Sequence, residues 1–194
     1  MLENLNKYKI VLASNSPRRH ELMSGLEIDY EIKTLPDIDE SYPESLKAEE
    51  IPLYISRHKA EAYRNVMKDN ELIITADTIV YIDNQVLGKP KDEEDAKAML
   101  HKLSGRTHLV ITGVCLTTSS WQRSFSATTE VTFATLTDEE ISHYVTKYKP
   151  LDKAGAYGVQ ELIGYIGVSS LKGSYYNVMG LPIQRLYREL QNIC

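Results

Sequence analysis

Apolar residues along this chain follow strand patterns that alternate with helix patterns. Near-continuous apolar runs at residues 8–13 and 72–80 predict buried strands, and the second run is typical of a central strand. Residues 29–33 predict a further strand. Residues 108–117 and 124–133 predict an antiparallel pair joined across Ser119-Ser120-Trp121. This alternation indicates an α/β fold.

Helical segments are predicted by apolar periodicity and by capping residues. The expected helices are a short one from Pro17 to Gly25 with Ser16 as N-cap, one over 49–67, one after Asp92 that ends at Ser104-Gly105, one after a capping box at Thr137–Glu140, and one after Pro182. On the second helix, Ile55, Ala60, Ala62 and Val66 are expected on the buried face. Residues 154–180 are rich in Gly and Tyr and predict loops and short strands around a cleft.

Composition narrows the class of protein. With 194 residues, 42% of them hydrophobic and 25% charged, the chain is expected to form one domain over 1–194, with two lobes around a cleft allowed. Its net charge of -5 argues against binding polymeric nucleic acid. Cys115 and Cys194 are too few and too far apart for a disulfide framework or a zinc site. Without a signal peptide or an apolar run of about 18 residues, we expect a cytoplasmic protein with no membrane partner.

The first strand and helix frame a candidate phosphate site. A strand–turn–helix directs backbone N–H groups and the positive end of a helix dipole at one spot, which favours an anion. Ser14, Ser16, Arg18 and Arg19 add hydroxyls and guanidiniums there. Consecutive helical residues diverge by roughly 100°, so we expect one arginine to grip the substrate and the other to brace the site. The alternative is an ordinary capped helix with two solvated arginines.

Carboxylates supply the candidate metal ligands and general base. Asp77 lies within an apolar strand, where a carboxylate is costly unless it is paired, binds a metal or lies at a strand end that opens on a cleft. A structural Asp that accepts backbone hydrogen bonds is the alternative. Asp37, Asp39 and Glu40 lie in an acidic loop that is either a solvated surface or the source of a second carboxylate for a divalent cation.

Further cations and one amide complete the candidate chemistry. Lys59 lies on a basic helix and is by default a solvated residue, whereas Lys89 is held between Gly88 and Pro90 and suits either a phosphate contact or a hairpin end. Gln160, on a glycine-containing loop, offers the donor and acceptor needed to recognise a base edge. The sequence has no G-x-x-x-x-G-K-[ST] loop and no G-x-G-x-x-G motif. The set fits hydrolysis of a nucleotide phosphoanhydride.

Together these motifs closely resemble the Maf family of nucleoside triphosphate pyrophosphatases, also called septum formation inhibitor proteins. The matching segments, in chain order, are Ala13-Ser14-Asn15-Ser16-Pro17-Arg18-Arg19, Asp39-Glu40, Lys59-Ala60, Ala76-Asp77-Thr78, Gly88-Lys89-Pro90, Leu103-Ser104-Gly105-Arg106-Thr107-His108, Asp152-Lys153-Ala154-Gly155-Ala156-Tyr157-Gly158-Val159-Gln160 and Gly173-Ser174-Tyr175-Tyr176-Asn177-Val178-Met179-Gly180-Leu181-Pro182. Each motif alone is weak, but their shared order over nearly the whole chain is specific.

The resemblance implies a fold and an activity. The fold is an α/β structure with an elongated mixed sheet, flanking helices and a central cleft, as in inosine triphosphate pyrophosphatases. The activity is hydrolysis of a nucleoside triphosphate to the monophosphate and pyrophosphate with a divalent cation, Mg²⁺ or Mn²⁺, and a homodimer is allowed. By resemblance, Asp77 is the proton acceptor, Glu40 supports the metal together with Asp77, and Lys59 and Lys89 bind phosphates.

The resemblance also addresses base preference. The residues at the positions that distinguish subfamilies are Arg18, Thr78 and Gln160, which resemble the branch that acts on dTTP and UTP. Glu161 departs from the pattern, because many relatives have Gly directly after the glutamine. The alternatives are a purine-type enzyme for inosine, xanthosine or methylated guanosine triphosphates, and a non-catalytic, nucleotide-binding regulator of septum formation.

Overall fold

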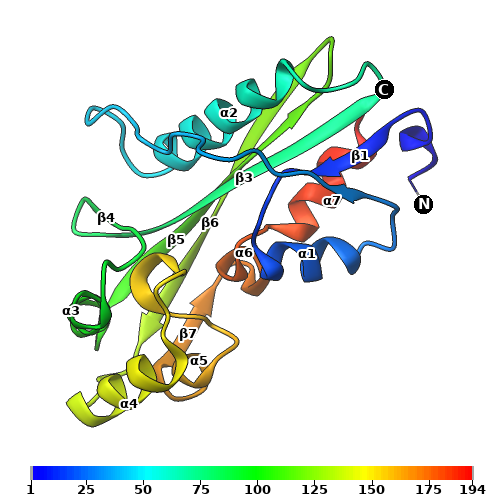
Figure 1. The fold of residues 1–194 in the computed structure, drawn as a ribbon. Helices are drawn as coiled ribbons and strands as arrows, with labels where there is room; N and C mark the ends of the chain where they lie inside the picture. The colour runs from blue at the N-terminus through cyan, green and yellow to red at the C-terminus, as the bar shows by residue number, and fades with distance from the viewer. Residues whose placement is uncertain (1, 194) are drawn as a thin grey trace. The chain divides into compact units, whose positions relative to one another are not determined.

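A computed structural model describes residues 2–193 of the chain as a mixed α/β fold (Figure 1). Seven strands form one sheet in the order β2-β1-β3-β5-β6-β7, and β4 pairs with β3 off this path. The chain divides into two compact units. Among the described residues, unit 1 comprises 2–77, 112–127 and 180–193, and unit 2 comprises 78–111 and 128–179. The predicted α/β class with helices flanking a mixed sheet is confirmed.

Unit 1 is built on parallel strand pairing. β1 (Lys9–Leu12) pairs in parallel with β2 (Glu31–Ile32) and with the first residues of β3 (Glu71–Ile82). Buried apolar residues from β1 and the position after it, from β3 and from the helix α2 (Glu50–Arg64) form one core cluster of Val11, Ala13, Tyr63 and Ile73. The remaining helices of this unit are η1 (Glu3–Leu5), α1 (Pro17–Ser24) and α7 (Ile183–Gln191). Burial of this cluster holds α2 on the sheet.

The helix α2 lies directly against the strand β5 (Thr107–Thr117) at one glycine. A Cβ atom added at Gly113 would come within 2.3 Å of the carbonyl carbon and oxygen of Pro52. Such an approach is shorter than any van der Waals contact, so only glycine fits this position. Gly113 therefore sets the distance between α2 and the sheet, and with it the depth of the α2 side chains in unit 1.

Unit 2 begins where β3 continues past Asp77. A two-residue turn at Asp83 and Asn84, both with positive φ, joins β3 to β4 (Gln85–Leu87), as the primed hairpin turns require. The helix α3 (Glu93–Leu103) starts at an Asp92 cap, and α4 (Asp138–Tyr148) starts at a capping box. The later elements are η2 (Ala154–Ala156), α5 (Leu162–Gly167), β7 (Val168–Lys172), which pairs antiparallel with β6 (Gln122–Phe133), and α6 (Tyr175–Met179).

Most predicted elements are confirmed. Hydrogen bonds from Thr118 N to Trp121 O and from Phe133 N to Arg106 O, each 2.9 Å, close the two ends of the β5–β6 pair in antiparallel register. The ends of each predicted strand lie within about two residues of those of an observed strand. The five predicted helices correspond to α1, α2, α3, α4 and α7.

Two local predictions are wrong. The helix predicted over 49–67 ends at Arg64, so Val66 lies beyond it and is 54% exposed, and Tyr63 takes the buried position instead. Residues 154–180 contain the short helices α5 and α6 as well as β7. Ser16 occupies the N-cap position of α1 as predicted, although its side chain makes no capping hydrogen bond.

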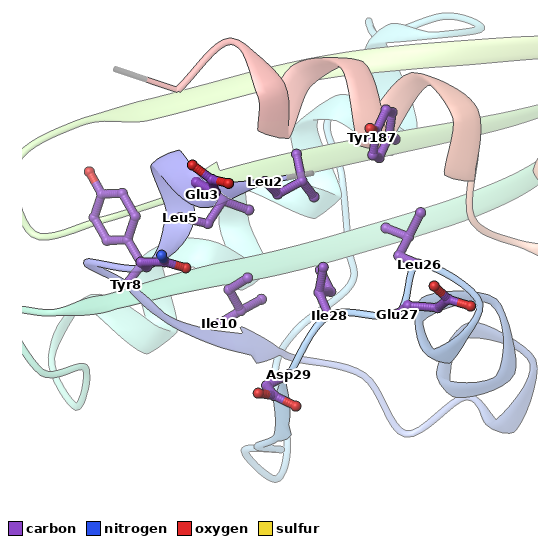
Figure 2. Close-up of a pocket in the computed structure, with 11 residues that line it drawn as sticks. Leu2, Glu3, Leu5, Tyr8, Ile10, Leu26, Glu27, Ile28, Asp29 and Tyr187 are labelled. Carbon is purple, nitrogen blue, oxygen red and sulfur yellow. The ribbon is translucent and has the colours of Figure 1, made fainter.

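A pocket of about 410 Å³ lies in unit 1, where η1 faces the segment after α1 and the helix α7 (Figure 2). Its lining includes Leu5, Ile10, Ile28 and Tyr187 together with the carboxylates of Glu3 and Asp29. No candidate residue from the sequence lines it. Across residues 2–193, no helix is both long and apolar enough to span a membrane.

Candidate active site

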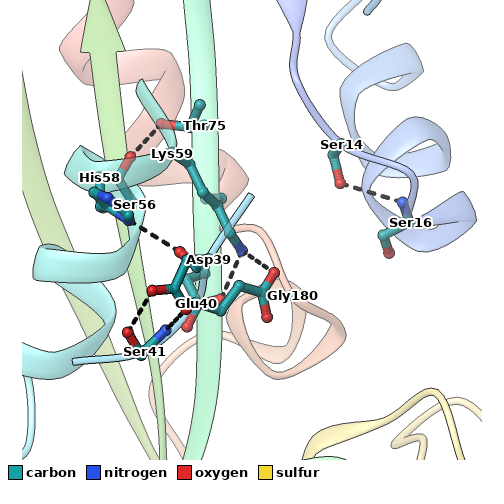
Figure 3. A network of polar contacts seen from close by, with 12 residues as sticks. Ser14, Ser16, Asp39, Glu40, Ser41, Ser56, His58, Lys59, Thr75 and Gly180 are labelled. Atoms are coloured by element: carbon teal, nitrogen blue, oxygen red, sulfur yellow. Dashed lines mark hydrogen bonds and ion pairs between the residues drawn. The ribbon is translucent and has the colours of Figure 1, made fainter. Parts of the chain in front are cut away.

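Three candidate residues from distant parts of the chain meet in unit 1. The Lys59 Nζ atom lies 2.8 Å from Glu40 Oε1 (Figure 3). It also lies 2.9 Å from Asp77 Oδ1. The side chains of Asp77 and Lys59 are 12% and 13% exposed, whereas that of Glu40 is 52% exposed. Asp77 is therefore paired with a cation. Pairing is one of the conditions under which a carboxylate is expected within an apolar strand. Lys59 is not the solvated residue that its basic helix suggests by default.

The neighbouring strand fixes the helix that carries Lys59. The Thr75 hydroxyl donates a 2.7 Å hydrogen bond to the Ser56 carbonyl, and both residues are buried. Ala60 packs without any exposed surface on the same helix. These contacts place Lys59, three residues after Ser56, opposite Asp77, two residues after Thr75. The strand and the helix thus set the Lys59–Asp77 pair before any ligand binds.

The acidic loop that carries Glu40 is ordered by its own polar contacts. The Asp39 carboxylate accepts hydrogen bonds from the Ser41 backbone N–H at 2.9 Å and from the Ser41 hydroxyl at 2.6 Å (Figure 3). The Ser41 hydroxyl hydrogen bond is the main cause that lowers the pKa of Asp39. His58 Nδ1 donates to the Asp39 carbonyl at 2.9 Å. Sequence reasoning missed His58 and Ser41 as residues that hold this loop beside α2, although His58 directly precedes Lys59.

The two arginines of the first motif differ in role. Arg19 Nε donates to the Gly180 carbonyl at 2.7 Å, and its Nη1 donates to the Ala76 carbonyl at 2.9 Å. Burial lowers the pKa of Arg19, and the carboxylates of Asp77 and Glu40 act in the opposite direction. Two donors of Arg19 are thus bound to backbone carbonyls, one of them from the residue before Asp77. Arg19 therefore supports the backbone beside Asp77. Arg18, about 100° around α1, is partly exposed.

The loop before α1 is organised around Ser14. Ser14 is buried, and its Oγ accepts a hydrogen bond of 3.2 Å from the Ser16 backbone N–H. His20 Nε2 lies 2.6 Å from the Ser14 carbonyl. The Ser14 hydroxyl therefore accepts the hydrogen bond of one backbone N–H group at the start of α1, which would otherwise be available to a ligand. Ser14 shapes the turn, and Ser16 carries the partly exposed hydroxyl of the pair.

The other candidates, Thr78, Lys89 and Gln160, belong to unit 2. Lys89 is exposed on the turn after β4, and Thr78 is partly buried. Gly155 N donates a 3.0 Å hydrogen bond to the Gly88 carbonyl, which ties the Lys89 turn to the loop that leads to Gln160. Gly155 has φ +67°, and a Cβ there would lie 2.8 Å from Val80 Cγ2, so this contact requires glycine.

Gln160 itself has one unused polar atom. Its Oε1 is buried and has no hydrogen-bond partner within residues 2–193. A buried polar atom without a partner costs about 1–3 kcal/mol, which a donor from a ligand would offset. The amide is therefore the group in this loop with hydrogen-bonding capacity to spare.

Asp77 and Glu40 could hold a divalent cation, with the two carboxylates as its protein ligands. Within the described part of the chain, no group of three or more His, Cys, Asp or Glu side chains is arranged to bind a metal. The carboxylates of Asp77 and Glu40 nevertheless converge on one cationic atom, Lys59 Nζ. Mg²⁺ commonly takes one or two carboxylates, with substrate phosphates and water as its other ligands. The donor set fits that mode and not an all-protein cage.

Comparison with known proteins places the chain in a family. The model of the family described as "Maf-like protein" matches residues 9–193. A dTTP/UTP pyrophosphatase of Phocaeicola vulgatus is 69% identical over 193 residues, and one of Bacteroides thetaiotaomicron is 64% identical over 193 residues; each match covers 100% of both chains.

Solved structures support the fold alone. The Ham1 protein of Staphylococcus aureus aligns with a TM-score of 0.52 at 18% identity, covering 93% of this chain and 99% of that one. A HAM1 protein from Coxiella burnetii aligns with a TM-score of 0.51 at 19% identity, covering 94% and 98%. The family match spans both units and every candidate residue, and the chain belongs to the Maf family.

Proposed function

We propose that this chain hydrolyses nucleoside triphosphates, with dTTP and UTP as preferred substrates, to the monophosphate and pyrophosphate. The observation that carries the proposal is the convergence of Asp77, Lys59 and Glu40 in a partly enclosed cluster. Relatives 69% and 64% identical over the full chain bear the name dTTP/UTP pyrophosphatase. An enzyme that acts on the nucleotide pool would work in the cytoplasm. In this proposal both units together form one Maf domain.

In this proposal Asp77 is the general base. Its carboxylate accepts a proton from the water that attacks a phosphoanhydride phosphorus. The ion pair with Lys59 fixes the direction in which the carboxylate points, and the Arg19 brace fixes the strand beside it through the Ala76 carbonyl. A divalent cation held by Glu40 and Asp77 would neutralise phosphate charge and acidify bound water.

Phosphate binding is divided among the cations. Lys59, Arg18 and Lys89 stabilise charge that builds on the phosphate oxygens during hydrolysis. Ser14 and Ser16 shape the start of α1 for the same phosphates. Arg19 supports this group without contacting substrate, since backbone carbonyls engage two of its donors.

Base preference rests on the Gln160 amide, together with Thr78 and Arg18. An amide presents one acceptor and one donor, which match the N3–H and O4 edge of thymine or uracil. The unpartnered Gln160 Oε1 supports a ligand contact here. A mismatched base leaves such groups unpaired, so we expect dTTP and UTP to exceed GTP and ATP by at least about tenfold in kcat/KM.

The test is a pyrophosphate-release screen with dTTP, UTP, ATP, GTP, ITP and a methylated guanosine triphosphate, each with Mg²⁺, with Mn²⁺ and with chelator. The proposal predicts monophosphate and pyrophosphate as products, metal-dependent turnover and a pyrimidine preference. Release of orthophosphate, or no turnover of any triphosphate, would contradict the activity. Faster hydrolysis of ITP or of the methylated guanosine triphosphate would contradict the base preference alone.

A further inference from the structure

We propose that Glu161 is a positioning residue for base recognition, and that with Tyr144 and Lys153 it holds the turn that presents Gln160. This inference rests on the proposed function, because it assigns a cause to the orientation of the amide that recognises the base. All four residues lie in unit 2. None of the three supporting residues was a candidate from the sequence.

Gln160 lies inside a closed turn. The Glu161 backbone N–H donates a 3.0 Å hydrogen bond to the Gly158 carbonyl, so the four residues 158–161 form a β-turn with Gln160 at its third position. The Gly158 N–H donates a 3.0 Å hydrogen bond to the Tyr144 hydroxyl. Both ends of the turn are therefore within reach of one side chain.

The Glu161 carboxylate completes a link across that turn. The Tyr144 hydroxyl donates a short hydrogen bond to Glu161 Oε2 while it accepts from Gly158 N. Burial, followed by the hydrogen bond to Glu161, raises the pKa of Tyr144, so the hydroxyl keeps its proton and remains a donor. Glu161 Oε1 lies 3.2 Å from Lys153 Nζ, which also contacts Asp152 Oδ1 at 2.8 Å. The carboxylate thus joins the turn to α4 and to the start of its own loop.

This network is held in low-exposure surroundings. Tyr144 is fully buried, and the Lys153 side chain is 10% exposed. A Cβ atom at Gly158 would lie 2.9 Å from the Glu161 Cδ atom, so the carboxylate packs on the first residue of the turn. A charge in such a site is costly to leave without its partner. Loss of the Glu161 carboxylate should therefore let the turn move, because the Tyr144 hydroxyl loses its acceptor and Lys153 is left with Asp152 as its carboxylate partner.

The backbone on either side of Gln160 is also fixed. Tyr157, buried just before the turn, has its hydroxyl 2.7 Å from His108 Nε2. Just after the turn, a Cβ on Gly164 would overlap the Val159 carbonyl oxygen at 1.7 Å, so α5 starts directly against the turn. Movement is thus confined to the segment that Glu161 and Tyr144 hold. Misplacement of a recognition group by about 1 Å is enough to lose a productive contact.

The experiment compares Glu161→Gln and Tyr144→Phe with the parent, and uses Glu130→Gln as a matched control. Glu130 also pairs with a lysine in unit 2, at 3.3 Å from Lys172, but on an exposed surface. We measure kcat and KM for dTTP and for GTP. We expect each of the two variants to lower the dTTP-to-GTP ratio of kcat/KM by about fivefold to tenfold, mainly through KM for dTTP, and the control to leave it unchanged.

A double-mutant cycle separates positioning from general stability. In a Gln160→Ala background, Glu161→Gln should leave the dTTP-to-GTP ratio unchanged, because the amide that it positions is gone. An unchanged ratio in the single variants, or an additive loss in the double variant, would overturn the inference. If Tyr144→Phe does not fold, Glu161→Gln, which keeps the side-chain volume, decides the matter. Should the parent hydrolyse no triphosphate, the proposed function fails, and calorimetric affinities for dTTP and GTP then test positioning with the same cycle.

Discussion

The Asp77 cluster of unit 1 and the Gln160 turn of unit 2 solve different problems with different interactions. In the first, two carboxylates, Asp77 on β3 and Glu40 in an acidic loop, share the Lys59 ammonium group on α2, and Glu40 remains half exposed. In the second, one side chain amide is presented by a turn whose supports, Tyr144 and Lys153, are buried. In the first region only Glu40 is open to solvent, because the Asp77 and Lys59 side chains are 12% and 13% exposed. A group that discriminates between bases is held by a buried framework.

This contrast predicts that the two regions can be separated by mutation. Damage to the Asp77 cluster should lower the rate for every triphosphate by a common factor, because all of them share the phosphate chain. Damage to the Gln160 turn should change the ranking of bases and spare the chemical step.

The largest effect is expected for Asp77→Asn. The amide keeps the shape of the carboxylate but cannot accept a proton from water. General base catalysis contributes about 10²–10⁴-fold, so kcat should fall by a factor in that range while nucleotide affinity is retained. Steady-state pyrophosphate release and calorimetric binding measure the two quantities, and Glu94→Gln, an exposed carboxylate change, is the control. Turnover within about tenfold of the parent would remove Asp77 from the role of base.

Loss of a phosphate-binding cation should come next. Lys59→Met, Lys89→Met and Arg18→Ala are each expected to cost about 2–4 kcal/mol in transition-state stabilisation if the lost charge faces the phosphates in a water-poor site. The decrease in kcat/KM should be equal for dTTP and GTP in the two lysine variants. Lys97→Met, which removes a partly exposed lysine paired with Glu94, is the matched control. A lysine variant with unchanged kcat and KM would show that this lysine does not bind the phosphates.

A smaller effect is expected at Gln160. Gln160→Glu replaces the donor side of the amide with an acceptor, so the edge of thymine or uracil loses one of its two hydrogen bonds. We expect the preference for dTTP over GTP in kcat/KM to shrink by about tenfold, equivalent to about 1.4 kcal/mol, with a smaller decrease in total hydrolysis. A preference that survives intact would show that another group recognises the base.

The last prediction concerns the pH dependence of folding stability, not catalysis. Burial lowers the pKa of His108 to about 4 from the ordinary value of 6.5. Because the unfolded chain binds this proton more readily, the stabilisation is complete above pH 6.5 and is lost as the pH falls from 6.5 towards 4, by up to about 3 kcal/mol. Urea unfolding at several pH values should show this slope, which His108→Gln should reduce. An unchanged slope in His108→Gln would assign the pH dependence to other groups.

How much of this could be predicted from the sequence differs between the two regions. The apolar run that contains Asp77 predicted both the strand and an unusual carboxylate within it, and the structure supplies the partner, Lys59. The identity of that partner could not be predicted, because it depends on the distance at which α2 rests on the sheet, which Gly113 and the Thr75–Ser56 hydrogen bond set. The apolar periodicity also predicted a helix that extends past its observed end at Arg64. Val66 was therefore expected to be buried, whereas the buried residue is Tyr63.

The surroundings of Gln160 were less predictable. A segment rich in Gly and Tyr indicated loops, and the helices α5 and α6 within it are too short to give a periodic signal. The sequence marked Glu161 as a departure from the family pattern but gave no function for it. Its link to Tyr144 joins residues 17 positions apart, so it depends on the packing of α4. Arg18 and Arg19 were likewise indistinguishable until the carbonyls of Ala76 and Gly180 identified Arg19 as the brace.

The most direct test of the account measures kcat/KM for dTTP and GTP in the parent, in Asp77→Asn and in Gln160→Glu under identical metal concentrations. The account predicts that Asp77→Asn lowers both values by the same large factor and leaves their ratio unchanged. It also predicts that Gln160→Glu lowers the ratio by about tenfold through the dTTP value. A change of ratio in Asp77→Asn, or an equal loss for both nucleotides in Gln160→Glu, would contradict the separation of chemistry from base recognition.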